Sequence, residues 1–101
     1  MFDKLLQAQQ KADEVKQRLD NISVSGETEG GKVRVIASAN KEVRELTIDP
    51  DLFARAEKEE LEEIIIVAIN KALAQAERVS QSEMQAVSQD LLGGFGNLFN
   101  K

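Results

Sequence analysis

The side chains that most often carry out enzyme chemistry are missing from this sequence. Its 101 residues include no Cys and no His. Without Cys there can be no disulfide, no thiolate nucleophile and no thiolate-bound metal. Without His the chain lacks the usual general base and the commonest transition-metal ligand. Carboxylates are the first remaining candidates for chemistry.

Paired carboxylates occur at Glu59-Glu60 and at Glu62-Glu63, so a hydrolase that uses two carboxylates must be considered. No aromatic platform for a sugar accompanies them, because the chain has no Trp and no Tyr. The four glutamates fall where a helix is expected to begin, and acid there complements the helix macrodipole. No loop has the ligand spacing of a Ca²⁺ or Mg²⁺ site. We therefore predict a solvated helix start, and a protein that is not an enzyme and needs no metal, cofactor or small-molecule substrate.

The glycines and the lysine in Gly26-x-x-x-x-Gly31-Lys32 have the spacing of a phosphate-binding loop. However, Val33 stands where a Mg²⁺-binding Ser or Thr is needed. A strand is also expected to follow, instead of a helix whose N-terminus would meet the phosphates. Two glutamates inside the loop would repel an anion. The pattern therefore predicts a glycine-rich hairpin turn.

Basic residues recur every seven positions near the start of the chain. Residues 2–20 form a heptad pattern with Leu5, Ala12 and Leu19 on its apolar seam. The positions beside that seam carry three cations, and a fourth lies near the same end: Lys4, Lys11, Arg18 and Lys16. Such a stripe can follow the phosphates of a nucleic acid. The alternative is that these cations pair with acids on a partner helix or are only solvated.

A second basic group lies on the predicted strands, at Lys32, Arg34 and Lys41. Ion pairing with Glu42 and Glu45 is the alternative role for this group. Aromatic residues that could stack on bases are missing here. No helix-turn-helix or zinc-finger pattern is present either. If the two basic groups bind DNA, we expect contacts to phosphates and to DNA shape to dominate over base reading.

The hydrophobic pattern predicts one α+β domain over residues 1–92 and a flexible C-terminal tail over 93–101. Its elements are an N-terminal helix, a three-stranded antiparallel meander and a long C-terminal helix. The first helix covers 2–20, and the strands lie at about 22–25, 32–38 and 43–48. Asp49-Pro50-Asp51 is a helix-start signal. The long helix runs from about Lys58 to Leu92, where Gly93-Gly94 ends it.

The long helix also predicts a homodimer. At about 50 Å it is longer than a domain of this size can cover, so part of it must project, break or pack on another chain. Its apolar stripe includes the residues that we expect at the dimer interface, with the two alanines in a close helix contact: Leu61, Ile65, Ala68 and Ala72. The longest apolar run, residues 64–69, is far too short to cross a membrane. No secretory signal precedes it, so we expect a cytoplasmic protein.

The ordered set of these motifs resembles the YbaB/EbfC family of nucleoid-associated proteins over nearly the whole chain. The matching segments are Met1-Phe2 with Gln7-Ala8-Gln9-Gln10, Ser25-Gly26-x-x-x-Gly30-Gly31-Lys32-Val33, Leu46-Thr47-Ile48-Asp49-Pro50-x-Leu52, and Leu61 with Val67-Ala68-Ile69-Asn70-Lys71-Ala72. The resemblance implies an αβββα homodimer whose projecting helices straddle duplex DNA with little sequence preference. It also implies association with the nucleoid and effects on gene expression.

The charge balance supports a competing hypothesis. The chain has 13 basic and 18 acidic residues and a net charge of −5, which is the wrong sign for a simple DNA-binding protein. Much of the acid is concentrated between Glu57 and Glu63. The alternative function is therefore an acidic structural or adaptor protein that binds another protein through its long helix and through the tail at Phe95–Phe99.

Overall fold

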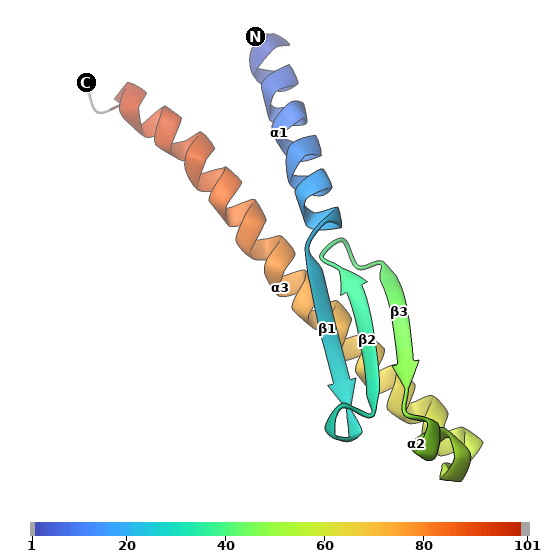
Figure 1. The fold of residues 1–101 in the computed structure, drawn as a ribbon. Coiled ribbons are helices and arrows are strands. Elements are labelled where there is room, and N and C mark those ends of the chain that lie inside the picture. The colour runs from blue at the N-terminus through green and yellow to red at the C-terminus, as the bar shows by residue number, and fades with distance from the viewer. Residues whose placement is uncertain (1, 100–101) are drawn as a thin grey trace.

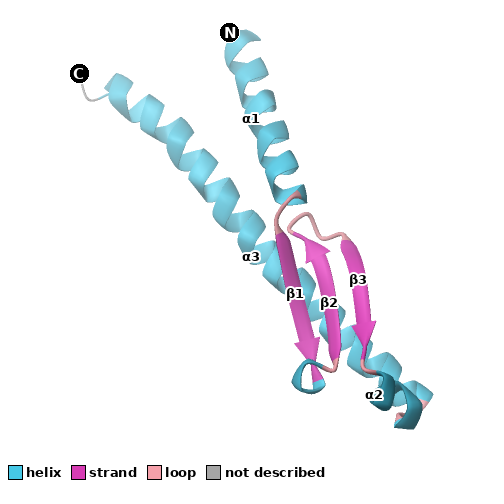
Figure 2. Ribbon diagram, viewed as in Figure 1, coloured by secondary structure: helices cyan, strands magenta, loops and turns pink. Residues whose placement is uncertain are grey.

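The structure is a computed structural model that describes the backbone of residues 2–99 and the side chains of residues 3–89. The elements in chain order are α1 (Phe2–Asp20), β1 (Ser23–Thr28), the short 3₁₀ turn η1 (Glu29–Gly31), β2 (Val33–Ser38), β3 (Val43–Ile48), α2 (Pro50–Arg55) and α3 (Lys58–Phe99). The predicted α+β class is confirmed. The three strands form one antiparallel sheet in the order β1-β2-β3, and α3 packs along one face of it (Figure 2).

Strand β2 is the centre of the sheet and of the core. Val33, Val35 and Ala37 alternate toward α3 and are fully buried, whereas Arg34 faces the other way and is exposed. This is the period-2 pattern that the sequence predicts for a half-buried strand. In the antiparallel pairs, Val35 lies opposite Gly26 of β1 and Leu46 of β3.

A β-bulge changes the faces of β3. Ile36 pairs with Glu45, but the next residue, Ala37, pairs with Val43, so β3 contains one extra residue at this point. Val43 therefore lies on the helix-facing side together with Leu46. Strict alternation predicts these two residues on opposite faces, and that prediction is wrong because the bulge inserts a residue between them.

Gly26 lies within β1, not in the hairpin turn that the sequence predicts to begin there. The turn is formed instead by Glu29, Gly30 and Gly31, all of which have positive φ angles. At Gly26 the strand crosses α3 so closely that an added Cβ would overlap the carbonyl oxygen of Ala68 and lie 2.5 Å from the backbone nitrogen of Ala72. The absence of a side chain at Gly26 therefore allows β1 to pack against the alanine face of α3.

Helix α1 and the C-terminal part of α3 leave the same end of the sheet and diverge as two arms (Figure 1). Val15 and Leu19 anchor α1, where they pack with Ala39 and with Val79 and Val87 of α3. The molecule measures 68 × 23 × 17 Å with a radius of gyration of 19.4 Å, whereas a compact chain of this length has a radius of about 13 Å. The arms are the reason for this extended shape.

Both ends of α3 can be compared with the sequence. The break before it is confirmed, because Asp49 caps α2 by accepting a hydrogen bond from the Leu52 nitrogen and α3 begins at Lys58. The predicted end at Leu92 is wrong, because the backbone is helical as far as Phe99. Glycine lowers helix propensity by about 1 kcal/mol but does not clash with the helix, and the apolar residues around Gly93-Gly94 favour continuation. The predicted flexibility of residues 93–101 stays a prediction.

Candidate nucleic-acid interface

Lys4, Lys11 and Arg18, the cations spaced seven residues apart in α1, form a stripe on the side of the helix that faces α3. Val15 and Leu19 define this side because they are buried, and Lys11 and Arg18 are one turn away from Val15 in each direction. Lys4 continues the stripe toward the N-terminus. An ion pair between Arg18 and α3 confirms the direction of this face. The stripe therefore lines the gap between the two arms.

Among the seven predicted cations, Arg18, Arg34 and Lys41 form ion pairs with described residues of the same chain. Arg18 Nε lies 3.5 Å from Glu83 Oε2 of α3, Arg34 Nε lies 3.4 Å from Glu27 Oε1, and Lys41 pairs with Glu77. Pairing on the strands was predicted as the alternative role, but with Glu42 and Glu45 as the partners. All three cations remain about half exposed, and exposed pairs of this kind contribute little to stability.

Three other predicted cations keep their charges in solvent. Lys11, Lys16 and Lys32 are exposed and have no ion pair or side-chain hydrogen bond with any residue that the structure describes. Lys4 is exposed near the start of α1. Lys16 points away from the inner stripe, because it lies about a quarter turn from Val15 around the helix. The arm therefore presents positive charge on its inner side and on one flank.

The ion pair between Lys41 and Glu77 shifts the pKa of its carboxyl group. Lys41 precedes β3 in the loop after β2, and it has a positive φ of 68°. The hydrogen bond and the charge of Lys41 lower the pKa of the Glu77 carboxyl below its ordinary value of 4.5, with a smaller contribution from Gln81. Glu77 is therefore charged at neutral pH, and its charge is offset by Lys41.

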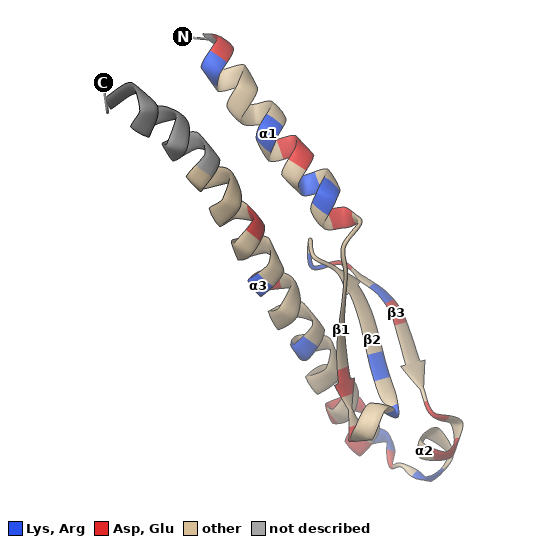
Figure 3. Ribbon diagram, turned by 60° about the vertical axis from the view of Figure 1, so that its left-hand side comes forward, with Lys and Arg blue, Asp and Glu red and all other residues tan. Residues whose placement is uncertain are grey.

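Acidic and basic residues are unevenly distributed along the molecule (Figure 3). Residues 49–63, which form α2 and the first turns of α3, carry seven acidic and two basic residues. This segment alone has a net charge of −5, the same as the whole chain, so the rest of the chain is neutral overall. It lies at the end of the molecule opposite the arms. The net negative charge of the whole chain therefore arises from this acidic end and not from the arms.

Helix α3 carries three cations that the sequence prediction did not include, and two of them lie beyond its acidic first turns. Lys71 and Arg78 are exposed and line a pocket beside β1. They are seven residues apart, which places them on one side of the helix. The same spacing identified the stripe on α1, so this signal could have found them.

The family model for the YbaB/EbfC DNA-binding family matches residues 1–91 of this chain. The chain belongs to this family. Two relatives named "Nucleoid-associated protein" agree with the assignment. The one from Flavobacterium johnsoniae is 33% identical, with 98% of this chain and 94% of the relative covered. The one from Rhodopseudomonas palustris strain TIE-1 is 40% identical, with 95% of this chain and 87% of the relative covered.

The YbaB/EbfC fold is also found in a solved structure. The crystal structure of an uncharacterized protein from Helicobacter pylori matches with a TM-score of 0.63 and 22% sequence identity. The match covers 77% of this chain and 92% of that chain. Within the residues described, no helix of this YbaB/EbfC chain is long and apolar enough to cross a membrane, and no group of three acidic residues is arranged to hold a metal ion.

The residues predicted at a dimer interface have two different environments in this YbaB/EbfC chain. Leu61 and Ile65 are half-buried. Ala68 and Ala72 are fully buried against β1 of the same chain. The close contact predicted for the two alanines is present, but its partner is a strand of the same chain. These alanines have no exposed surface to offer a second copy.

The YbaB/EbfC chain leaves part of its helix-facing sheet surface uncovered, because α3 lies mainly over β1 and β2. Leu46 and Val43 of β3 belong to that face and are 47% and 43% exposed. On α3, Ile66 is 55% exposed and lies one turn before Ile69, which packs at the edge of the core. These half-exposed apolar side chains of β3 and α3 flank the same edge of the sheet and form an exposed hydrophobic patch.

Proposed function

We propose that this protein is a nucleoid-associated protein that binds duplex DNA through phosphate contacts with little sequence preference. Membership of a DNA-binding family supports the proposal, as do the names of the relatives. The proposal places the protein in the cytoplasm, on the nucleoid, and gives it no enzymatic role. By occupying DNA without chemical change it would influence nucleoid organisation and gene expression.

The observation that carries the proposal is the position of the arm cations relative to the acid. Arg18 pairs with Glu83 of α3, Lys11 and Lys4 continue the same stripe along α1 by helical spacing, and the net negative charge lies at the opposite end of the molecule. A polyanion is therefore repelled by one end and meets cations at the other. Phosphate contacts carry no sequence information, and the sequence offers no device that reads bases, so the binding should be nearly independent of sequence.

The proposal includes a homodimer. Leu61 and Ile65 would contribute to the interface together with the exposed apolar residues Val43, Leu46 and Ile66. A second copy would remove these side chains from water, and the burial of apolar surface favours association. Two copies would also double the number of arm cations that meet one DNA molecule.

The proposal is tested by reversing the charge of the arm. We choose Lys4→Glu with Lys11→Glu, because Arg18 also joins the two arms through Glu83. In a gel-shift assay with a random-sequence duplex, this variant should lose at least about tenfold in affinity, since both copies in a dimer lose two phosphate contacts. A matched control is Arg55→Glu with Lys58→Glu, which changes the net charge equally at the acidic end. If both variants behave alike, the arms are not the DNA-binding surface.

The alternative function, an acidic adaptor that binds another protein, is favoured by the half-exposed apolar residues beside β3. Fluorescence anisotropy with a labelled random duplex separates the two. An adaptor should bind no DNA at low or at moderate salt.

A further inference from the structure

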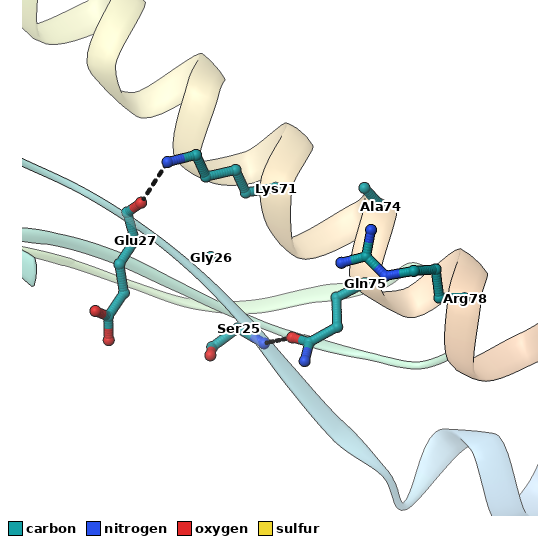
Figure 4. A pocket seen from close by; sticks show the side chains of 7 residues that line it. All are labelled: Ser25, Gly26, Glu27, Lys71, Ala74, Gln75 and Arg78. Atoms are coloured by element: carbon teal, nitrogen blue, oxygen red, sulfur yellow. Dashed lines mark hydrogen bonds between the residues drawn. The ribbon is translucent and has the colours of Figure 1, made fainter.

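A pocket lies at the outer edge of β1, where the strand meets α3. It is lined by residues 25–27 of β1 and by Lys71, Ala74, Gln75 and Arg78 of α3 (Figure 4). The cations of this pocket belong to α3 beside the sheet, and so they are distinct from the stripe on α1.

Side chains of α3 hold the wall of this pocket in place. β1 is an edge strand, so half of its backbone groups have no neighbouring strand to bond. The Ser25 nitrogen donates to Gln75 Oε1 at 2.9 Å, and Lys71 Nζ donates to the Glu27 carbonyl oxygen at 3.2 Å. Because Gln75 uses its oxygen as an acceptor, the amide NH₂ group of Gln75 is left to donate to a ligand.

The pocket carries two positive charges that no acid in the described part of the chain neutralises. The Lys71 ammonium bonds a neutral carbonyl, and Arg78 has no ion pair among the described residues. The Glu27 carboxylate pairs with Arg34 and points away from Lys71 (Figure 4). Along this part of α3, Glu77 is paired with Lys41 of the loop after β2. The Lys71 and Arg78 side chains both lean toward the N-terminal end of α3, one behind the other along the pocket (Figure 4).

We propose that this pocket binds a phosphodiester group of the DNA backbone. Arg78 and Lys71 are the charged donors, and Gln75 is the neutral donor. A guanidinium suits this role because its planar fork can donate two parallel hydrogen bonds to phosphate oxygens. The inference rests on the proposed function and adds to it a phosphate contact beside the sheet, at the base of the α3 arm.

Arg78→Gln is the test variant, because Lys71 also bonds the edge of β1 and its loss would disturb the strand. Arg55→Gln is the matched control. Arg55 is exposed at the end of α2, has no ion pair in the described part of the chain, and carries the same charge. Both variants should show the circular dichroism and melting temperature of the wild type. Affinity is measured by fluorescence anisotropy with a labelled random-sequence duplex over a series of salt concentrations.

Arg78→Gln should weaken binding by about three- to tenfold at moderate salt. It should also make the slope of log affinity against log salt shallower by about 0.9 for each occupied pocket, whereas Arg55→Gln leaves both quantities near those of the wild type. Arg78→Lys should restore most of the affinity. If Arg78→Gln matches Arg55→Gln in affinity and in slope, the pocket proposal is overturned while the proposed function stands.

A wild type that binds no duplex would overturn the proposed function instead, and a second measurement then decides the pocket. Inorganic phosphate is titrated while the NMR signals of the Arg78 Nε–H and the Gln75 side-chain amide are followed. Saturable shifts of both signals that are absent in Arg78→Gln would support an anion site. Unmoved signals would overturn it.

Discussion

Gly26 shows how one missing side chain sets the spacing of two elements. It lies in β1 directly over the buried alanines Ala68 and Ala72, and the helix backbone occupies the space where a Cβ would be. Neither partner can move away easily, because Val24 in the same strand is in the core. The position therefore requires glycine for close approach, although its φ angle is ordinary for a strand.

Gly26→Ala should accordingly lower the free energy of unfolding by about 3 kcal/mol, near the upper end for an overpacked core. Gly30→Ala is the control. Nothing lies within 4 Å of a Cβ at Gly30, but its φ of 66° makes alanine strained, so a loss of only about 1 kcal/mol is expected. Chemical denaturation measures both. Equal losses of unfolding free energy in the two variants would show that the close approach at Gly26 does not set the cost of adding a Cβ there.

Spacing alone could not assign these glycines. The phosphate-loop pattern was rejected correctly, because a strand follows Gly31 and because Val33 is buried in the core. The predicted hairpin turn is present at Gly30 and Gly31 but does not include Gly26. Only the structure shows that Gly26 packs on a helix more than forty residues later in the chain. The pairing of Arg18 with Glu83 and of Lys41 with Glu77 was hidden for the same reason, since each pair joins distant segments.

Glu77 makes one contact depend on pH. Its folded-state pKa lies below the ordinary value of 4.5 because Lys41 bonds and attracts its charged form. A lowered folded-state pKa means that the stabilisation is fully present above the unfolded value. It is lost as the pH falls through the lowered pKa.

The difference in unfolding free energy between the wild type and Glu77→Gln should therefore be present at pH 7. It should disappear in acid below the lowered pKa, where both side chains are uncharged. Glu42→Gln is the control, because Glu42 neighbours Lys41 but forms no ion pair in the described part of the chain. Denaturation at several pH values measures the difference. A difference between wild type and Glu77→Gln that does not change with pH would contradict the assigned pairing.

At the scale of the elements, α1 is held by its last two turns. Asn40, in the loop after β2, donates through Nδ2 to the Lys16 carbonyl oxygen at 2.8 Å and to Asp20. The Ala39 nitrogen donates to the Leu19 carbonyl oxygen at 3.2 Å. The Leu19 carbonyl is one of those that a helix end leaves without an intrahelical partner. The loop therefore fixes the direction in which α1 leaves the sheet.

Asn40→Ala should loosen this joint. We expect a loss of about 1 kcal/mol in stability and faster amide hydrogen exchange in the last turns of α1. Asn21→Ala is the control, because Asn21 bonds only the Gln17 carbonyl oxygen of its own helix. Hydrogen exchange followed by mass spectrometry measures the effect. If the amides of α1 exchange equally slowly in both variants, Asn40 does not position the arm.

The type and order of the elements could be predicted from the sequence, because hydrophobic period and helix-start residues are local signals. The start of α2 follows from such a signal, because Asp49 caps this helix and Pro50 is its first residue. Two features of the fold could not be predicted from such local signals. The β3 bulge arises from pairing with β2, and it moves Val43 to the face of Leu46. The continuation of α3 through Gly93 shows that two glycines weaken a helix without ending it.

At the scale of the whole molecule, two separated regions have different properties. One end is acidic, and at the other end the cations lie on the α1 arm, because α3 has no Lys or Arg between Arg78 and its end at Phe99. Between them, the uncovered edge of the sheet carries exposed apolar residues of β3 and α3. The long helix predicts a dimer through Leu61, Ile65, Ala68 and Ala72. The sequence could not show that the two alanines are buried against β1, because an alanine stripe packs on a strand and on a helix in the same way.

Leu46→Glu should convert the proposed dimer to a folded monomer, because Leu46 is half exposed within one chain and a second copy would bury its charge at a cost of several kcal/mol. Thr47→Glu is the control. Thr47 is the next residue of β3, is exposed and pairs with Arg34, whose side chain faces away from α3. Light scattering coupled to size exclusion measures the mass. A wild-type monomer, or a Leu46→Glu dimer, would contradict the interface.

The most direct measurement compares two duplexes of equal length and unrelated sequence, each titrated with the wild-type protein at about 50 mM and about 200 mM salt. The account predicts dissociation constants that agree within about threefold between the duplexes and that rise together with salt, since phosphates make the contacts. Binding to neither duplex at either salt concentration would contradict the account. A preference of about a thousandfold for one sequence, as in specific readers, would contradict it equally.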